Sequence, residues 1–311
     1  MLNFCTLFDS NYLSYGLAMY RSLKKNCPDF HLFIFAFDEK CEKDLKDLAL
    51  ENVTVISLKD FEDEELLRIK PSRNKGEYCW TCTPSSVLYV LKNFPVASCT
   101  YLDADLYFFS DPTILIEELG NKSVSIIEHR YTPKYDQSVD SGKYCVQFMT
   151  FKNDEKGLEV LKWWRERCIE WCYGRVEDGK FGDQKYLDDW MHKFDCVYEL
   201  QNLGGGVAPW NVQQYNFTEE NGEIFGVDKK SGDIFPLIFF HFHGFKVLNE
   251  KQVKLTGAYK IPINVRNLIY KKYCEQMAAS NSSKKNNSLL NKIYNFLPHR
   301  KNNKVKITWL T

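Results

Sequence analysis

The first third of the chain alternates between short apolar runs and amphipathic stretches. Residues 3–8, 31–37 and 52–58 are apolar on both faces, which is typical of strands in a parallel sheet that helices cover on both sides. Residues 13–23 and 41–50 lie between these runs and carry apolar side chains at helical spacing. This β-α-β-α-β order predicts an α/β protein with a mostly parallel central sheet flanked by helices.

The same two patterns continue in the middle of the chain. A helix is expected to begin at Thr83-Pro84 and to lead into an apolar run at residues 100–109. Residues 124–127 and 146–151 predict two further buried strands, and residues 155–173 predict a long helix with an apolar stripe.

Two aspartates interrupt the apolar run at residues 100–109. Side chains alternate along a strand, so Asp103 and Asp105 are expected on one face, about 6–7 Å apart along the backbone. Two carboxylates in an apolar setting lose solvation energy unless a cation or hydrogen-bond donors meet them. Their oxygens suit Mg²⁺ or Mn²⁺. The alternative is a strand end that opens into a polar turn, with Asp105 or Asp111 capping the next element.

A second polar group comes after the first predicted strand. Asp9, Asn11 and Tyr12 lie directly after that strand. Parallel sheets bind ligands at the carboxyl ends of their strands, so these side chains should share one rim with Asp103 and Asp105. Neither Gly-x-Gly-x-x-Gly nor Gly-x-x-x-x-Gly-Lys-Ser/Thr occurs there, which argues against a dinucleotide-binding fingerprint and against a P-loop.

Two irregular segments come after the long helix. Gly182 permits a tight turn, and Asp183 beside it is placed to cap the next helix. Further on, three consecutive glycines precede Pro209 and Trp210. A plain surface loop does not usually carry a Trp, so this second segment is a candidate for close approach to a ligand.

The last informative strand is expected at residues 236–246 and carries two histidines. His241 and His243 are predicted to share a face, and Gly244 and Lys246 come after them. A histidine can complete a carboxylate metal site, and a lysine can meet phosphate charge. Core histidines are commoner than metal ligands, so the metal interpretation depends on the aspartate pair as well.

Composition narrows the functional classes. The 41 basic and 41 acidic residues cancel, so no global field favours nucleic acid, and none is expected as a partner. Aromatic residues make up 15% of the chain, which suits a well-packed core and sites where bases or sugars stack. The eleven cysteines lie mostly in apolar runs and are expected to be reduced, as in the cytoplasm. A membrane-spanning helix is not expected, because no apolar run reaches about twenty residues.

The end of the chain has a different character. Residues 280–288 are polar and linker-like, residues 289–297 have an amphipathic pattern, and no acidic residue occurs after Glu275. We therefore divide the chain into one domain at residues 1–279 and a basic tail at residues 280–311. Such a tail favours either contact with the cytoplasmic face of a membrane or a solvated, fraying terminus.

These motifs together resemble those of the GT-A glycosyltransferases. They are most similar to the retaining enzymes of glycosyltransferase family 8 and to related bacterial polysaccharide and lipopolysaccharide glycosyltransferases. Four matches carry the resemblance, in the family's order: Asp9-Ser10-Asn11-Tyr12, Asp103-Ala104-Asp105, Gly182-Asp183-Gln184 and His241-Phe242-His243-Gly244. The resemblance implies the Rossmann-like GT-A fold of nucleotide-diphospho-sugar transferases.

The resemblance also implies a role for each motif. Mn²⁺ or Mg²⁺ would be bound by Asp103, Asp105 and His241, with His243 as the alternative to His241. Asp183 and Gln184 would be catalytic, beside the anomeric carbon. Contacts with the nucleotide-sugar are implied for Asp9, Asn11, Tyr12, Asp103, Ala104, Gly244 and Lys246.

The reaction implied is transfer of a hexose-type sugar from a nucleotide donor, UDP above all, to a glycan or glycolipid acceptor with retention. Two departures from the family pattern bear on the donor. Lys246 stands two residues after Gly244 instead of three, and residues 82–86 lack the family's basic residue.

Two other classes remain open. A phosphatase of the haloacid-dehalogenase type also uses Asp-x-Asp at a strand end, although in its first strand. A non-catalytic sugar-nucleotide-binding domain would bind UDP with metal and show no turnover.

Overall fold

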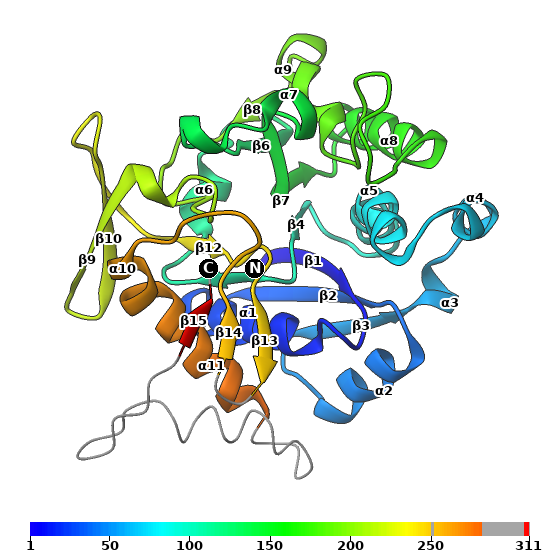
Figure 1. Ribbon diagram of the computed structural model, residues 1–311. Helices are drawn as coiled ribbons and strands as arrows, with labels where there is room; N and C mark the ends of the chain where they lie inside the picture. The colour runs from blue at the N-terminus through cyan, green and yellow to red at the C-terminus, as the bar shows by residue number, and fades with distance from the viewer. Residues whose placement is uncertain (250–251, 282–307, 311) are drawn as a thin grey trace.

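The computed structural model describes residues 1–249, 252–281 and 308–310, and its centre is a seven-stranded sheet (Figure 1). Neighbouring strands of this sheet run parallel except at β7, which is antiparallel to both β4 and β6. In spatial order the strands are β3 (Val53–Ser57), β2 (Phe30–Ala36), β1 (Leu2–Phe8), β4 (Ser98–Leu102), β7 (Tyr144–Lys152), β6 (Val124–Glu128) and β8 (Val197–Glu199).

Helices cover both faces of the sheet (Figure 1). Along β1, Cys5 joins the core on one face and Phe4 the core on the other. This two-sided burial explains why the strands are apolar on both faces. The covering helices are α5 (Lys75–Asn93) and α8 (Glu155–Glu170) on one face, and α1 (Leu13–Asn26) and α2 (Glu39–Leu48) on the other.

The elements predicted for the first third of the chain are all present. The helix expected at residues 155–173 is also confirmed, since Leu161, Trp164 and Cys168 on its stripe are fully buried. Short helices α3 (Leu58–Phe61) and α4 (Glu64–Ile69) connect β3 to α5.

The helix before β4 begins earlier than predicted. α5 starts at Lys75, where Asn74 and Glu77 form a capping box, and Pro84 lies inside the helix. The expectation that Thr83-Pro84 opens this helix is therefore wrong. The capping box satisfies two orphan N–H groups at the true start, and tertiary packing tolerates the one helical hydrogen bond that the proline removes.

The apolar run at residues 100–109 is not one strand. β4 ends at Leu102, and β5 (Leu106–Phe108) leaves the central sheet to pair with β12 (Phe239–His241). The Leu106 N–H donates to the carbonyl of Asp103 across the turn between them (3.3 Å). The prediction that the two aspartates lie on one face of a single strand is wrong, because the chain changes sheets between them.

The late histidine strand also divides. β12 ends at His241, and a turn through Gly244, whose φ is +73°, leads to β13 (Lys246–Asn249). His243 therefore lies in the turn and not on the strand with His241. β13 pairs with β14 (Gln252–Lys254), which pairs in turn with β15 (Thr308–Leu310).

A third core supports the outer side of β12. It joins Phe240 and Phe242 to Tyr273, whose ring stacks on Phe242 at 3.7 Å. The elements around it are β9 (Tyr215–Glu220), β10 (Glu223–Asp228), β11 (Ile234–Pro236), the π-helical turn η5 (Arg266–Tyr270) and α11 (Lys271–Asn281).

Several expectations concern the whole chain. All eleven cysteines are free. Within the described ranges, no helix has the length and apolar character needed to cross a membrane. The amphipathic segment expected at residues 289–297 lies outside the described residues, so the division at residues 279 and 280 stays a prediction.

Candidate functional site

Three side chains from distant parts of the sequence meet beside the carboxyl end of β4. His241 Nε2 lies 3.1 Å from Asp105 Oδ1 and 3.7 Å from Asp103 Oδ2. The potential ligand atoms of all three residues lie within 4.8 Å of one another. The side chains of Asp103 and Asp105 are 28% and 15% exposed, whereas that of His241 is 6% exposed. The carboxylates are therefore reachable from solvent, and the imidazole lies behind them.

Backbone hydrogen bonds fix the two aspartates. The Asp103 N–H donates to the carbonyl of Gln147 on β7 (3.0 Å). The Phe242 N–H, just after β12, donates to the carbonyl of Asp105 (2.9 Å). The turn between β4 and β5 is thus held between the central sheet and β12.

The triple-glycine segment holds β12 from its other side. The His241 N–H donates to the carbonyl of Val207 (2.9 Å). A Cβ on Gly204 would lie 2.1 Å from the carbonyl oxygen of Pro236, and Gly206 has a φ of +82°. The close approach at Gly204 is therefore to the end of β11 (Ile234–Pro236), just before the strand that carries His241, and a Cβ on Gly206 would meet Ile127.

The charges of the three side chains are strongly coupled. Burial raises the pKa of Asp103 to about 6, although His241 opposes the shift. Burial also acts against the charge on Asp105, but the neighbouring His241 lowers the pKa of this carboxyl below its ordinary value. For His241, burial is outweighed by Asp105 and Asp103, which raise its pKa well above the ordinary value. The two carboxylates therefore favour a positive charge at this position.

Gln147 determines which nitrogen of His241 faces the aspartates. The Gln147 side chain is fully buried, and its Oε1 lies 2.8 Å from His241 Nδ1. An amide oxygen only accepts hydrogen bonds, so Nδ1 carries a proton and Nε2 points to the carboxylates. An imidazole oriented through its second nitrogen is typical of metal ligands. Two carboxylates and this imidazole form a donor set that fits Mn²⁺, and also Mg²⁺.

Sequence reasoning missed Gln147. The available signal was a single amide inside an otherwise apolar strand, between Val146 and Phe148. What could not be read from the sequence is that this position on β7 faces the end of β12.

The turn at residues 9–12 lies on the same rim, as predicted, because β1 and β4 are parallel neighbours. Asp9 accepts hydrogen bonds within this turn, from the Asn11 N–H and from Asn11 Nδ2, both at 2.9 Å. Tyr12 is 48% exposed. Burial, followed by the charges of Asp105 and Asp103, raises the pKa of Tyr12 to about 12, so its hydroxyl stays protonated at neutral pH.

Tyr15 connects this turn to the turn at residues 244–246. Its hydroxyl donates to the carbonyl of Phe245 (3.0 Å), and its ring lies 5.1 Å from that of Tyr12. Lys246, at the end of the second turn, is exposed. The two segments expected to contact a nucleotide thus lie next to each other, together with Gly244.

Asp183 is a buried carboxyl near the metal-ligand candidates. It is 6% exposed, and burial, followed by the charge of Asp103, raises its pKa to about 7. Gly182 before it has a φ of +52°, which confirms the tight turn. The short 3₁₀ helix after it begins at Lys185 and has no side-chain cap, so the capping interpretation of Asp183 is wrong.

Gln184 is turned toward the start of β7. Its Nε2 donates to the carbonyl of Ser141, the last residue of α7 (Ser138–Ser141). The indole N–H of Trp164 on α8 donates to the carbonyl of Asp183 (2.9 Å), which anchors this segment to the core.

His243 lies outside the group formed by Asp103, Asp105 and His241. It is exposed, and its ring lies 5.7 Å from that of Trp210. Trp210 also contacts His241, at 5.3 Å, and its indole N–H donates to the carbonyl of His129 (2.9 Å). The geometry thus favours His241 over His243 as the third ligand, and it gives Trp210 a packing role beside that ligand.

Two proteins of Bacillus subtilis (strain 168) are each 32% identical to this chain: the uncharacterized proteins YfnD and YfnF. The match with YfnD extends over 263 residues, 83% of this chain and 83% of YfnD. The match with YfnF extends over 259 residues, 81% of this chain and 84% of YfnF. The chain belongs to the family of YfnD and YfnF. No protein-family model matches it.

One solved structure matches this chain in its fold. The galactosyltransferase LgtC, in complex with donor and acceptor sugar analogues, matches with a TM-score of 0.54 at 12% identity. The match covers 89% of this chain and 96% of LgtC. The chain therefore has the GT-A fold, as the sequence motifs led us to expect.

Proposed function

We propose that this protein is a metal-dependent glycosyltransferase that moves a hexose-type sugar from a UDP-activated donor to a glycan or glycolipid acceptor. The observation that carries the proposal is the convergence of Asp103, Asp105 and His241 on the rim of a GT-A fold. LgtC, which has this fold, was crystallised with analogues of a donor and an acceptor sugar, and this supports a reaction with two sugar substrates.

The metal-ligand candidates suit a diphosphate substrate. A divalent cation held by Asp103, Asp105 and His241 would neutralise the diphosphate and so stabilise it as a leaving group. Gln147 keeps the imidazole in the orientation that this requires, because it fixes the proton on Nδ1.

The neighbouring turns offer the nucleotide a site. The half-exposed ring of Tyr12 can stack against a base, and Asp9 and Asn11 lie in the same turn. Lys246 is exposed at the end of the adjacent turn, where its ammonium group can meet phosphate charge.

Asp183 and Gln184 are the candidates for stabilising the reacting sugar. The carboxylate form of Asp183 would oppose the positive charge that develops at the anomeric carbon, and Gln184 would orient the ring. We infer that the acceptor hydroxyl attacks the anomeric carbon on the face that the diphosphate leaves and gives its proton to the departing phosphate, so the configuration is retained. Analysis of the product anomer by NMR tests this, and an inverted product would refute it.

The main experiment is a screen of nucleotide-sugars for hydrolysis in the presence of Mn²⁺. We expect wild-type protein to hydrolyse a UDP-sugar and Asp105→Asn to lose at least about 100-fold in rate, because metal stabilisation of a leaving group is worth several kcal/mol. Asp178→Asn is the matched control, since Asp178 is exposed and its φ of +50° suits asparagine.

Four results would contradict the proposal. The first is equal hydrolysis by wild type and Asp105→Asn, and the second is hydrolysis that EDTA does not affect. The third is release of phosphate from simple phosphate esters without any turnover of nucleotide-sugars, which would favour a phosphatase. The fourth is binding of UDP with Mn²⁺ but no turnover of any donor, which would indicate a non-catalytic domain.

A further inference from the structure

A cavity of about 690 Å³ opens beside the carboxyl end of β6. One of its walls is Tyr131, whose ring stacks on that of His129 at 4.6 Å. The ring centre of His129 lies 5.1 Å from that of Trp210, and the ring centre of Trp210 lies 5.3 Å from that of His241. The cavity is therefore separated from the candidate metal ligand by two aromatic side chains. Its volume is in the range of small-molecule sites.

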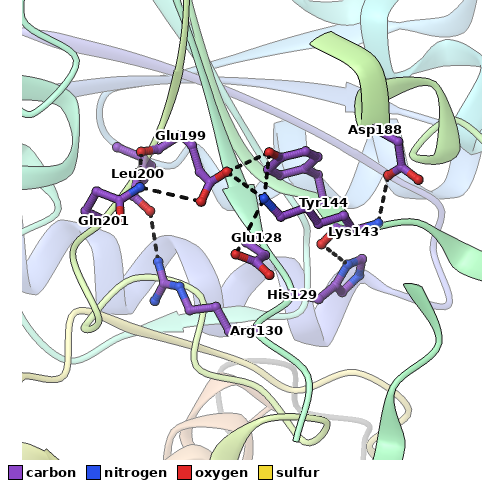
Figure 2. Close-up of polar contacts among 9 residues, drawn as sticks. All are labelled: Glu128, His129, Arg130, Lys143, Tyr144, Asp188, Glu199, Leu200 and Gln201. Carbon is purple, nitrogen blue, oxygen red and sulfur yellow. Dashed lines mark hydrogen bonds and ion pairs between the residues drawn. The ribbon is translucent and has the colours of Figure 1, made fainter. Parts of the chain in front are cut away.

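The two cations that line this cavity already have partners within the protein (Figure 2). Lys143 Nζ lies 2.9 Å from Glu199 Oε2 and 3.0 Å from the Tyr144 hydroxyl. Burial opposes the charge on Lys143, but these hydrogen bonds raise its pKa. The guanidinium of Arg130 donates, at 3.0–3.1 Å, to the backbone carbonyls of Leu200, Asn202 and Gly205. The charge of Lys143 is therefore matched by Glu199, and Arg130 directs three of its five N–H donors to the backbone.

Glu128 is the lining carboxylate that the protein compensates least. Its Oε2 lies 3.9 Å from Lys143 Nζ, too far for a hydrogen bond, and its side chain is 35% exposed (Figure 2). Among the described residues, no side chain or N–H group donates a hydrogen bond to it. Burial raises the pKa of Glu128 despite the proximity of Lys143. A cationic donor supplied by a ligand would stabilise this carboxylate.

The remaining lining has the character of a sugar site. The lining carries four carboxylates and two cations, so the cavity disfavours anions. The carboxylates are those of Glu128, Asp136, Asp188 and Asp228. Tyr131 is partly exposed and supplies aromatic surface against which the C–H face of a sugar ring can pack.

The cavity also adjoins a candidate catalytic residue. Ser138 and Val139 of α7 line it, and the carbonyl of Ser141 at the other end of this one-turn helix accepts the hydrogen bond from Gln184. Gln184 and the cavity therefore both adjoin α7.

We propose that this cavity binds an amino sugar of the acceptor, with the sugar's ammonium group paired to Glu128 and its ring packed on Tyr131. That the amino sugar belongs to an acceptor rests on the proposed function. Its binding requires neither the donor nor the metal.

The experiment measures binding of three sugar trimers to the full chain, without UDP or metal, by titration calorimetry. The probes are the trimer of glucosamine, the neutral maltotriose and the acidic trimer of galacturonic acid. The glucosamine trimer should bind wild type about tenfold more tightly than maltotriose, and the acidic trimer should bind most weakly, because a charge-assisted hydrogen bond contributes roughly 1.5–3 kcal/mol.

Two variants and a control locate the binding. Glu128→Gln should remove the preference for the glucosamine trimer, and Glu166→Gln should not, because Glu166 is exposed on α8 away from the cavity. Val139→Lys adds a positive charge at the rim and should weaken binding of the glucosamine trimer. Val139 is 83% exposed, so this variant will fold even if Glu128→Gln does not.

The outcomes separate this inference from the proposed function. If the glucosamine trimer does not bind, or binds Glu128→Gln and Val139→Lys as tightly as wild type, the inference is wrong. Titrating the same wild-type protein with UDP and Mn²⁺ tests the proposed function independently. Trimer binding with the expected variant effects but no binding of UDP would support the amino-sugar site and contradict the glycosyltransferase proposal.

Discussion

Replacing Asp183 with asparagine should remove a pH dependence that its buried carboxyl imposes on the stability of the metal-free protein. Burial, followed by the charge of Asp103, raises the pKa of Asp183 from 3.8 to about 7. Between these two values the folded state keeps a proton that the unfolded state has released. The contribution of this group to stability is therefore complete below about pH 4 and is lost as the pH rises toward 7.

The size of the effect can be worked out from the shift. A difference of about three pKa units corresponds to roughly 4 kcal/mol, at 1.36 kcal/mol for each unit, and this is an upper limit for one carboxyl. Asparagine has nearly the same shape and stays neutral at every pH. Relative to wild type, Asp183→Asn should therefore become more stable as the pH rises, by up to roughly 4 kcal/mol between pH 4 and pH 8.

The assay is urea unfolding of both proteins in EDTA at several pH values from 4.5 to 8, with the difference in unfolding free energy plotted against pH. Comparing the two proteins at each pH cancels the titration of shared groups that do not interact with Asp183, and the measured difference includes its interaction with Asp103. The exposed Asp178→Asn control should give a difference that does not change with pH. A constant difference for Asp183→Asn, or one that falls as the pH rises, would refute the assignment of a raised pKa to Asp183.

Three further predictions concern the residues that build the site. Gln147→Leu leaves Nδ1–H of His241 without its acceptor and should weaken Mn²⁺ binding about 10–100-fold in titration calorimetry, and an unchanged dissociation constant would contradict the orienting role. Gly204→Ala places a Cβ 2.1 Å from a backbone carbonyl oxygen and should destabilise the protein by more than about 2 kcal/mol in urea, whereas Gly257→Ala, which meets nothing within 4 Å, should be nearly neutral. Asn74→Ala removes the capping box of α5 and should cost about 1 kcal/mol of stability, and an unchanged urea midpoint would show that the cap does not stabilise this helix.

The fold was largely predictable because its signals are local. Strands buried on both faces must be apolar throughout, and the runs at residues 3–8, 31–37 and 52–58 correspond to β1, β2 and β3. Parallel neighbours end at the same rim, so the turn at residues 9–12 could be placed beside Asp103 without any knowledge of the structure. The prediction was wrong at Pro84, because a proline usually marks the first turn of a helix. Here the capping box at Asn74 begins the helix earlier, and Pro84 lies inside it.

The candidate site was predictable by residue type and not by geometry. The sequence by itself determined the α/β architecture, the shared rim, and the presence of Asp103, Asp105 and His241 as candidate ligands. Only the tertiary structure decided that the chain leaves the central sheet between the aspartates and that β5 pairs with β12. It alone also placed Gln147 behind His241. The physical reason is distance along the chain. Hydrophobic periodicity reports which face of one element is buried, whereas contacts between segments far apart in the sequence, such as Gln147 and His241, depend on the packing of the whole core.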